Sequence, residues 1–167
     1  MERAKVLVIT GTPGVGKSTL ARYLQKKFGW RRLDLHDYYH LLSSGYNRKK
    51  QCYDLDPRKV EQLVKSKAKE DSLPLIIDSH LAHHLPPKLV DLCVILTFSN
   101  LKQLRRRLEK RQYRKSKVQE NLEAEIFQIC LIEAKENGHE PLVFETITKK
   151  KLLKIGMEIY QKLNKKK

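Results

Sequence analysis

The sequence predicts a three-layer α/β fold in which about five parallel strands are covered on both faces by helices. The first observation behind this prediction is that short apolar runs alternate with helical stretches; the clearest runs lie at residues 5–10, 75–78 and 92–98. The second observation is a glycine-rich turn placed directly between the first apolar run and the first helical stretch. With 167 residues the chain is long enough to bury one full hydrophobic core. We therefore expect a single domain spanning residues 1–167.

The glycine-rich turn at residues 11–19 reads Gly-Thr-Pro-Gly-Val-Gly-Lys-Ser-Thr and matches the phosphate-binding pattern G-x-x-x-x-G-K-[ST]. Glycines allow the backbone to point successive N–H groups at a phosphate held over a helix N-terminus. In this pattern Lys17 reaches the β- and γ-phosphates of a nucleotide, and the Ser18 hydroxyl binds Mg²⁺. The alternative is a chance combination in a loop, which the flanking strand and helix disfavour. The sequence thus predicts a P-loop that binds ATP and Mg²⁺.

The first half of the chain continues the alternation. The helix after the P-loop ends near Gly29, a C-cap residue, and residues 30–35 have the length and alternation of a strand. Residues 43–57 are polar and rich in turn formers, with little periodicity, so we expect a loop or a small insert there. Asp56 is a favourable N-cap for a helix at about 57–71, in which apolar residues recur at helical spacing.

The second half begins with the apolar run 75–78, which ends in an acidic residue. This pattern is typical of a buried parallel strand that places a carboxylate at the carboxyl edge of the sheet. The run 92–98 is the clearest buried strand, and Asn100 is the expected N-cap of the next helix. Apolar spacing and end signals predict three further elements: a long helix at 118–136, a strand at 141–145 and a helix at 149–163.

The net charge of +16 arises from 35 lysines and arginines against 19 acidic residues. A phosphate site alone does not require this excess, which favours a polyanionic partner such as RNA or a ribonucleoprotein. The alternative is a lysine-rich solvated surface. The densest segment has nine basic residues and one acid, Glu109, and is either a positive clamp or a binding face: Lys102, Arg105, Arg106, Arg107, Lys110, Arg111, Arg114, Lys115 and Lys117.

The lengths of the apolar runs and the number of cysteines indicate the compartment of the protein and the redox state of its thiols. No apolar run approaches the roughly 20 residues of a membrane helix, and the first strand begins too early to leave room for a signal peptide. The three cysteines, Cys52, Cys93 and Cys130, are an odd number without metal-ligand spacing. We therefore expect a soluble cytoplasmic protein with no membrane contact and with reduced, mostly buried thiols.

The residues that accompany the P-loop indicate the reaction. A GTPase needs a guanine-specifying Asn-Lys-x-Asp segment, which the chain lacks, whereas a kinase needs a strand-end acid, an acceptor-binding insert and lid arginines. Asp78 is the candidate metal ligand and would hold Mg²⁺ directly or through a water molecule. The alternative is that its carboxylate caps a helix. His80 is a candidate to orient or deprotonate the attacking group, because an imidazole titrates near neutrality. The alternative is that His80 is a polar surface residue in a loop with His83 and His84.

Arginines just before the expected long helix lie where a lid would hinge. A guanidinium from a closing lid neutralises charge on the transferred phosphoryl group. We take Arg111 as the first candidate, ahead of Arg107 and Arg114. The alternative is that the whole run is a solvated or RNA-facing helix surface, and both roles are compatible.

The order of these motifs resembles the adenylate kinase isoenzyme 6 family, also called the coilin-interacting nuclear ATPase family, which includes archaeal adenylate kinase homologues. The resemblance is carried by segments 11–19, 78–80, 107–113 and 120–127 and spans nearly the whole chain. It implies a P-loop NTPase fold of the nucleoside monophosphate kinase type, with an acceptor-binding insert at about 37–57 and a lid at about 109–118.

The resemblance also implies an activity and partners. These are phosphoryl transfer from ATP to AMP or other nucleoside monophosphates, ATP hydrolysis, and late maturation of the small (30S) ribosomal subunit with 16S rRNA processing. The implied partners are the ribosomal protein uS11 and small-subunit pre-rRNA. Two rival functions stay open: a nucleotide-gated ribosomal-protein or RNA binding module with incidental kinase activity, and a metabolic small-molecule kinase without a ribosomal role.

The family's site residues are carried over position by position. The metal and hydrolysis pair falls on Asp78 and His80, the lid arginine on Arg111, and the adenine-side loop on Thr146 to Lys149. The ATP-binding set is Gly14, Gly16, Lys17, Ser18, Thr19, Arg111 and Lys149. The chain departs from the family at residues 47–50, Asn-Arg-Lys-Lys, where the relatives have an acidic insert, and this departure bears on the choice of monophosphate.

Overall fold

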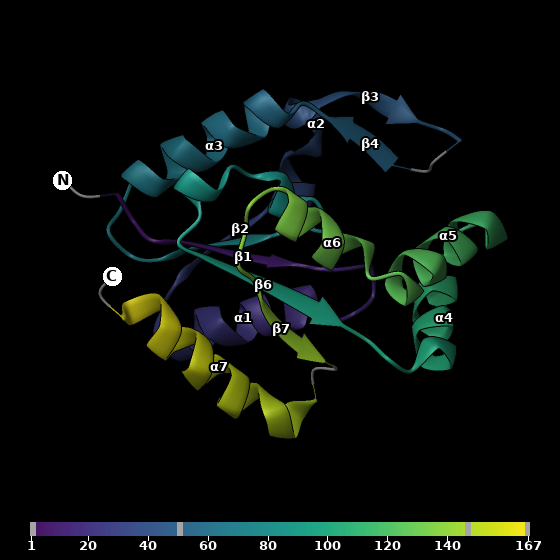
Figure 1. The fold of residues 1–167 in the computed structure, drawn as a ribbon. Coiled ribbons are helices and arrows are strands. Elements are labelled where there is room, and N and C mark those ends of the chain that lie inside the picture. Colours follow the sequence, from purple (N-terminus) through teal and green to yellow (C-terminus); the bar gives the residue numbers. More distant parts are fainter. Residues whose placement is uncertain (1–2, 50–51, 146–147, 166–167) are drawn as a thin grey trace.

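The computed structural model describes residues 3–49, 52–145 and 148–165. Its centre is a five-stranded sheet with the order β2-β5-β1-β6-β7, in which each neighbouring pair is parallel (Figure 1). The strands are β1 (Val6–Thr10), β2 (Arg31–Asp34), β5 (Leu75–Asp78), β6 (Leu92–Thr97) and β7 (Leu142–Glu145). The expected five-stranded parallel sheet is therefore confirmed.

Helices cover both faces of this sheet, which makes the three expected layers. In Figure 1, α1 and α7 lie on one face, while α3 and α6 lie on the other. The described α-helices are α1 (Lys17–Phe28), α2 (Tyr39–Leu42), α3 (Pro57–Lys69), α4 (Leu101–Lys110), α5 (Lys115–Ile126), α6 (Ile129–Glu136) and α7 (Lys149–Asn164). Short 3₁₀ turns are η1 (Leu35–Tyr38), η2 (Ala82–His84) and η3 (Pro87–Leu89).

Alternation along β1 divides the core into two clusters. Leu7 and Ile9 pack with residues of α1, α4, α5 and α7, whereas Val6 and Val8 pack with residues of α3, η2 and α6. All four side chains are fully buried, which explains why the strand reads as a continuous apolar run rather than an alternating one.

Strand register brings three chain segments to one edge of the sheet. Ile9 is paired with Asp78 across β1 and β5, and Asp34 is paired with Asp78 across β2 and β5. Thr10, the last residue of β1, is paired with Ile95 of β6. The P-loop and the acidic ends of β2 and β5 therefore meet at the carboxyl edge, where open α/β sheets bind ligands.

The expected caps are confirmed. Gly29 ends α1 in the left-handed conformation, with φ 70°, and its N–H donates to Gln25 O. The Asp56 carboxylate accepts a hydrogen bond from Arg58 N at the start of α3, and Asn100 accepts one from Gln103 N at the start of α4.

The expected long helix at 118–136 is wrong, because α5 and α6 are separate helices. Gln128 interrupts them in the left-handed conformation, with φ 51°. Val118 and Leu122 of α5 belong to the core cluster on one face of the sheet, whereas Ala134 of α6 belongs to the cluster on the other. A continuous helix cannot serve both faces, so the chain turns at Gln128.

The segment expected to be a loop or small insert contains an antiparallel hairpin, β3 (Ser43–Asn47) paired with β4 (Cys52–Leu55). A second short connection, residues 111–114, joins α4 to α5 and includes Gln112 at φ 59°. Both the hairpin and the α4–α5 pair stand beyond the carboxyl ends of the strands (Figure 1). They border the edge at which the P-loop lies.

Two further observations concern the described part of the chain. None of its helices is long and apolar enough to cross a membrane. Cys93 and Cys130 are free thiols, and burial raises their pKa values to about 12 and about 11, respectively. These values leave both thiols protonated near neutrality, as expected for structural cysteines.

Candidate nucleotide-binding site

The P-loop conformation requires glycine at two positions for steric reasons. Gly11 has φ 137°, and a Cβ there would lie 2.4 Å from the carbonyl oxygen of Leu96 in β6. Gly14 has φ 91°, and its Cβ would lie 3.0 Å from Leu104 Cδ1 in α4. The loop is thus pressed against β6 and α4, which leaves no room for a side chain at Gly11 and only a tight fit at Gly14.

Lys17 is the first residue of α1 and folds back over the loop. Its ammonium group donates to the carbonyl oxygens of Gly11 and Thr12, at 2.8 and 3.0 Å. Desolvation by burial lowers the pKa of Lys17 to about 8, against smaller raising effects of Cys130 and Asp78. Lys17 is therefore a positive charge in a poorly solvated position, which an anionic phosphate would stabilise.

A cleft of about 1030 Å³ opens over the P-loop and collects most of the residues predicted from the sequence. The predicted residues that line it are Gly14, Gly16, Lys17, Ser18, Thr19, Asp78, His80 and Arg111. Lys149 is not among the lining residues and is exposed at the start of α7. In the predicted adenine-side loop, Thr146 and Ile147 lie outside the described residues.

Asp78 is buried at the end of β5 and is paired with an arginine that sequence reasoning missed. Arg32 of β2 donates from Nε and Nη2 to Asp78 Oδ2, at 3.0 and 2.6 Å, and from Nη2 to Asp34 Oδ2, at 2.6 Å. The side chains of Arg32 and Asp78 are only 14% and 3% exposed. Asp78 is therefore held firmly in position by a neighbouring strand.

The positions of Ser18 and Asp78 show whether these two residues fit Mg²⁺. The Ser18 hydroxyl and the Asp78 carboxylate are hard oxygen groups, both on the wall of the cleft, and such groups suit Mg²⁺. Because Arg32 occupies Asp78 Oδ2, a contact through metal-bound water suits Asp78 better than direct ligation at that oxygen. Mg²⁺ usually retains several waters in nucleotide sites, so the pair fits.

His80 lies in the same cleft two residues beyond Asp78. Desolvation by burial lowers its pKa to about 3, and the positive charge of Lys17 and Lys117 adds to the effect. The imidazole is therefore neutral at physiological pH and weakly basic. The expectation that it titrates near neutrality is wrong for the protein as it stands in this structure, and a hydrogen-bonding, orienting role suits it better than proton abstraction.

Two of the three candidate lid arginines, Arg107 and Arg111, make different contacts. Arg107 donates to Gly14 O at 2.9 Å, and its guanidinium lies 4.4 Å from the centre of the Phe98 ring. It supports the P-loop backbone. Arg111, the C-cap residue of α4, lines the cleft and contributes to the lowered pKa of Lys17. Arg111 therefore has the position expected of a residue that faces phosphate charge.

The hairpin side of the cleft is aromatic, which sequence reasoning did not predict. Tyr39, Tyr46 and Tyr53 line the cleft. The ring centres of Tyr39 and Tyr53 are 5.5 Å apart, and those of Tyr46 and Tyr53 are 5.0 Å apart, both edge-to-face. Tyr46 and Tyr53 are directly paired across β3 and β4. The tyrosines in this otherwise polar, turn-rich segment were the feature of the sequence that could have indicated an aromatic wall.

Comparisons with known proteins match most of the chain, including the P-loop. The model of a family described as an AAA domain matches residues 7–128, which include the P-loop, Asp78, His80 and Arg111. An adenylate kinase isoenzyme 6 homolog of Schizosaccharomyces pombe is 38% identical over 141 residues, covering 83% of this chain and 79% of that protein. A protein of Pyrococcus furiosus named "Putative adenylate kinase" is 35% identical over 160 residues, covering 95% and 84% of the two chains.

Solved structures share the fold at low sequence identity. A gluconokinase from Sinorhizobium meliloti 1021 has a TM-score of 0.55 and 16% identity, with 98% of this chain and 93% of that chain covered. The protein TT1252 from Thermus thermophilus has a TM-score of 0.59 and 17% identity, with 96% and 97% covered. These likenesses concern the fold.

Proposed function

The chain belongs to the adenylate kinase isoenzyme 6 family, and from this premise we propose that it transfers the γ-phosphoryl group of ATP to AMP or another nucleoside monophosphate and also hydrolyses ATP. It is a P-loop nucleotide kinase-like protein by family and fold. The observation that supports phosphoryl transfer to a monophosphate is the cleft. The P-loop, Asp78, Arg111 and the tyrosines on the hairpin side all line this cleft.

The proposed division of roles follows from position. The backbone of residues 14–19 and the Lys17 ammonium bind the triphosphate, and Arg111 neutralises charge on the transferred group. Ser18 and Asp78 hold Mg²⁺, which neutralises phosphate charge when bound. His80 orients the attacking oxygen through a hydrogen bond.

The two reactions differ in the attacking group. In transfer, a phosphate oxygen of the monophosphate attacks the γ-phosphorus, the β–γ bridging P–O bond breaks, and both products are diphosphates. In hydrolysis a water oxygen attacks the same phosphorus, the same bridging P–O bond breaks, and the proton of the water passes to the phosphate product or to solvent, giving ADP and inorganic phosphate. The tyrosines of the hairpin side supply stacking surfaces suited to the base of an acceptor nucleotide.

A direct experiment separates the acceptors. With γ-labelled ATP and Mg²⁺, we expect label to appear in ADP when AMP is added and in inorganic phosphate when it is omitted. Tyr53→Ala should raise the KM for AMP more than that for ATP, while Tyr160→Ala, a change at a partly exposed tyrosine on α7, should alter neither. Label found in phosphate alone, with every monophosphate tried, would reduce the proposal to an ATPase.

A second candidate function rests on the net charge of +16 and on the basic run from Lys102 to Lys117. It is late maturation of the small ribosomal subunit in the cytoplasm, through uS11 and pre-rRNA, with ATP turnover remodelling the assembly. The support is the charge and the sequence resemblance. The test is a pull-down at ~0.15 M salt with and without ATP, in which recovery of no small-subunit component would exclude this function.

A further inference from the structure

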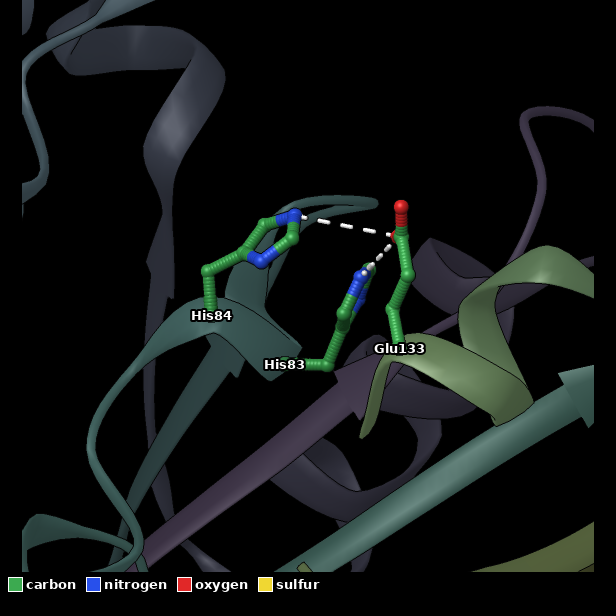
Figure 2. Close-up of side chains that lie close together, drawn as sticks. All are labelled: His83, His84 and Glu133. Carbon is green, nitrogen blue, oxygen red and sulfur yellow. Dashed lines mark hydrogen bonds and ion pairs between the residues drawn. The ribbon is translucent and has the colours of Figure 1, made fainter. Parts of the chain in front are cut away.

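Two histidines and a glutamate that the kinase proposal does not use converge on one point. His83 and His84 lie in η2, and Glu133 lies in α6, 50 residues further along the chain than His83. His83 Nε2 is 2.9 Å and His84 Nε2 is 3.8 Å from the same oxygen, Glu133 Oε2. Figure 2 shows both rings turned toward this carboxylate.

The separations suit a tetrahedral metal ion. Ligand atoms about 2.0–2.1 Å from a tetrahedral Zn²⁺ lie about 3.3–3.4 Å from one another. The two observed distances to Glu133 Oε2, 2.9 and 3.8 Å, fall on either side of that value, and one atom from each of the three residues lies within 4.8 Å of the others. The Glu133 side chain is 40% exposed, so its carboxylate has room to move toward the position that a bound ion requires.

Neighbouring groups hold both rings. Thr10 Oγ1 lies 2.9 Å from His83 Nδ1, and a hydroxyl is able to accept from a protonated Nδ1 as well as to donate to an unprotonated one. Asn137 Nδ2 donates to His83 O and to His84 Nδ1, both at 3.3 Å. By turning its amide Asn137 would present an oxygen to a protonated His84 Nδ1, at the cost of the hydrogen bond to His83 O. Such partners fix ring orientation in metal sites.

A hydrogen-bonded core histidine accounts for only part of the arrangement. Thr10 and Glu133 satisfy both nitrogens of His83, which is 1% exposed. His84 is held more weakly: its side chain is 45% exposed, its Nδ1 lies 3.3 Å from Asn137 Nδ2 and its Nε2 lies 3.8 Å from Glu133 Oε2, while its ring packs on His83 at a centroid distance of 4.2 Å. In water, a half-exposed imidazole gains little from such a position, whereas a ligand gains a metal bond.

We propose that His83, His84 and Glu133 form a site for one Zn²⁺ ion at the wall of the cleft. Two imidazoles and one carboxylate are a ligand set that proteins use for Zn²⁺, with the fourth position left to water. The set is softer than the hydroxyl and carboxylate oxygens proposed for Mg²⁺, so the two metals do not compete for one site. The bound ion clamps η2 to α6, and through Thr10 it lies next to the strand that leads into the P-loop.

The test uses the untagged, metal-free protein without nucleotide, titrated with Zn²⁺ in a calorimeter. We expect one Zn²⁺ per chain, with affinity reduced in His84→Ala and in Glu133→Gln by at least the roughly 10–100-fold that loss of an outer-shell partner costs. His40→Ala, a change at an exposed histidine of α2, is the matched control and should leave affinity unchanged.

Co²⁺ provides a second readout that is independent of affinity. The wild type and His40→Ala should give the visible absorption of tetrahedral Co²⁺, which His84→Ala should lose. Zn²⁺ should raise the Tm of the wild type but not that of His84→Ala. Equal Zn²⁺ affinity in all variants, or no stoichiometric Zn²⁺ binding by the wild type, would overturn the proposal and would leave the kinase proposal untouched.

Discussion

Arg32 donates two hydrogen bonds to a single oxygen of Asp78, at 2.6 and 3.0 Å, across the adjacent strands β2 and β5. The pair links Asp78, the proposed Mg²⁺ ligand, to β2, which is not a neighbour of β1, the strand that leads into the P-loop. Asp78 is therefore a preorganised carboxylate, and its position depends on a partner 46 residues earlier in the chain.

We expect Arg32→Ala to lower the free energy of unfolding by about 2–3 kcal/mol, because it leaves the buried Asp78 carboxylate without its charged partner. This is less than the roughly 3–5 kcal/mol of a fully buried pair, since the Arg32 side chain is partly exposed. Urea unfolding in Mg²⁺-free buffer measures the change. Arg58→Ala, at an exposed arginine of α3, is the control, and equal stability of the two variants would contradict the assignment.

Gly11→Ala tests whether the P-loop requires glycine for space as well as for conformation. The new methyl group would meet Leu96 O at 2.4 Å, whereas Gly29→Ala would place a methyl in the same left-handed half of backbone space with no atom within 4 Å. We expect Gly29→Ala to cost about 1–2 kcal/mol and Gly11→Ala to cost clearly more. Similar thermal unfolding of the two variants would remove the steric argument.

The lowered pKa of Lys17 predicts an alkaline limb in the rate profile. With a pKa of about 8 in the nucleotide-free protein, Lys17 is charged at pH 7 and loses its proton as the pH rises through 8. Since kcat/KM reports the free enzyme, kcat/KM for ATP should fall by up to about 10-fold per pH unit above that value. A flat profile between about pH 7 and 9.5 would show that Lys17 keeps its proton or does not bind the phosphates.

His80 should remain neutral far below the range in which an exposed histidine, with a pKa of about 6.5, gains its charge. Its pKa of about 3 arises from burial and from the nearby lysine charges. Proton NMR of the imidazole, assigned with His80→Gln, measures this directly. A resonance that shifts between about pH 6 and 7 would restore the titrating histidine that the sequence suggests.

Features set by local chemistry were predictable from the sequence. The buried strands β5 and β6 are short apolar runs, and the caps Asp56 and Asn100 act on their own first turns. The P-loop is a contiguous motif, so its place between β1 and α1 followed at once.

Features that depend on distant pairing were not predictable. The hairpin β3–β4 is exposed along much of its length, so no apolar alternation marks it. The break at Gln128 depends on which core each helix joins. Arg32 beside Asp78 and His83 beside Glu133 are contacts between residues far apart in the chain. Sequence spacing cannot indicate such contacts.

The most direct test of the kinase account is phosphoryl transfer by Lys17→Ala compared with Lys26→Ala, at an exposed lysine on the same helix. The account predicts that Lys17→Ala loses both AMP phosphorylation and ATP hydrolysis by on the order of 100-fold or more, while Lys26→Ala retains both. Transfer and hydrolysis at wild-type rates in Lys17→Ala would contradict it, because the P-loop would then not be where ATP reacts.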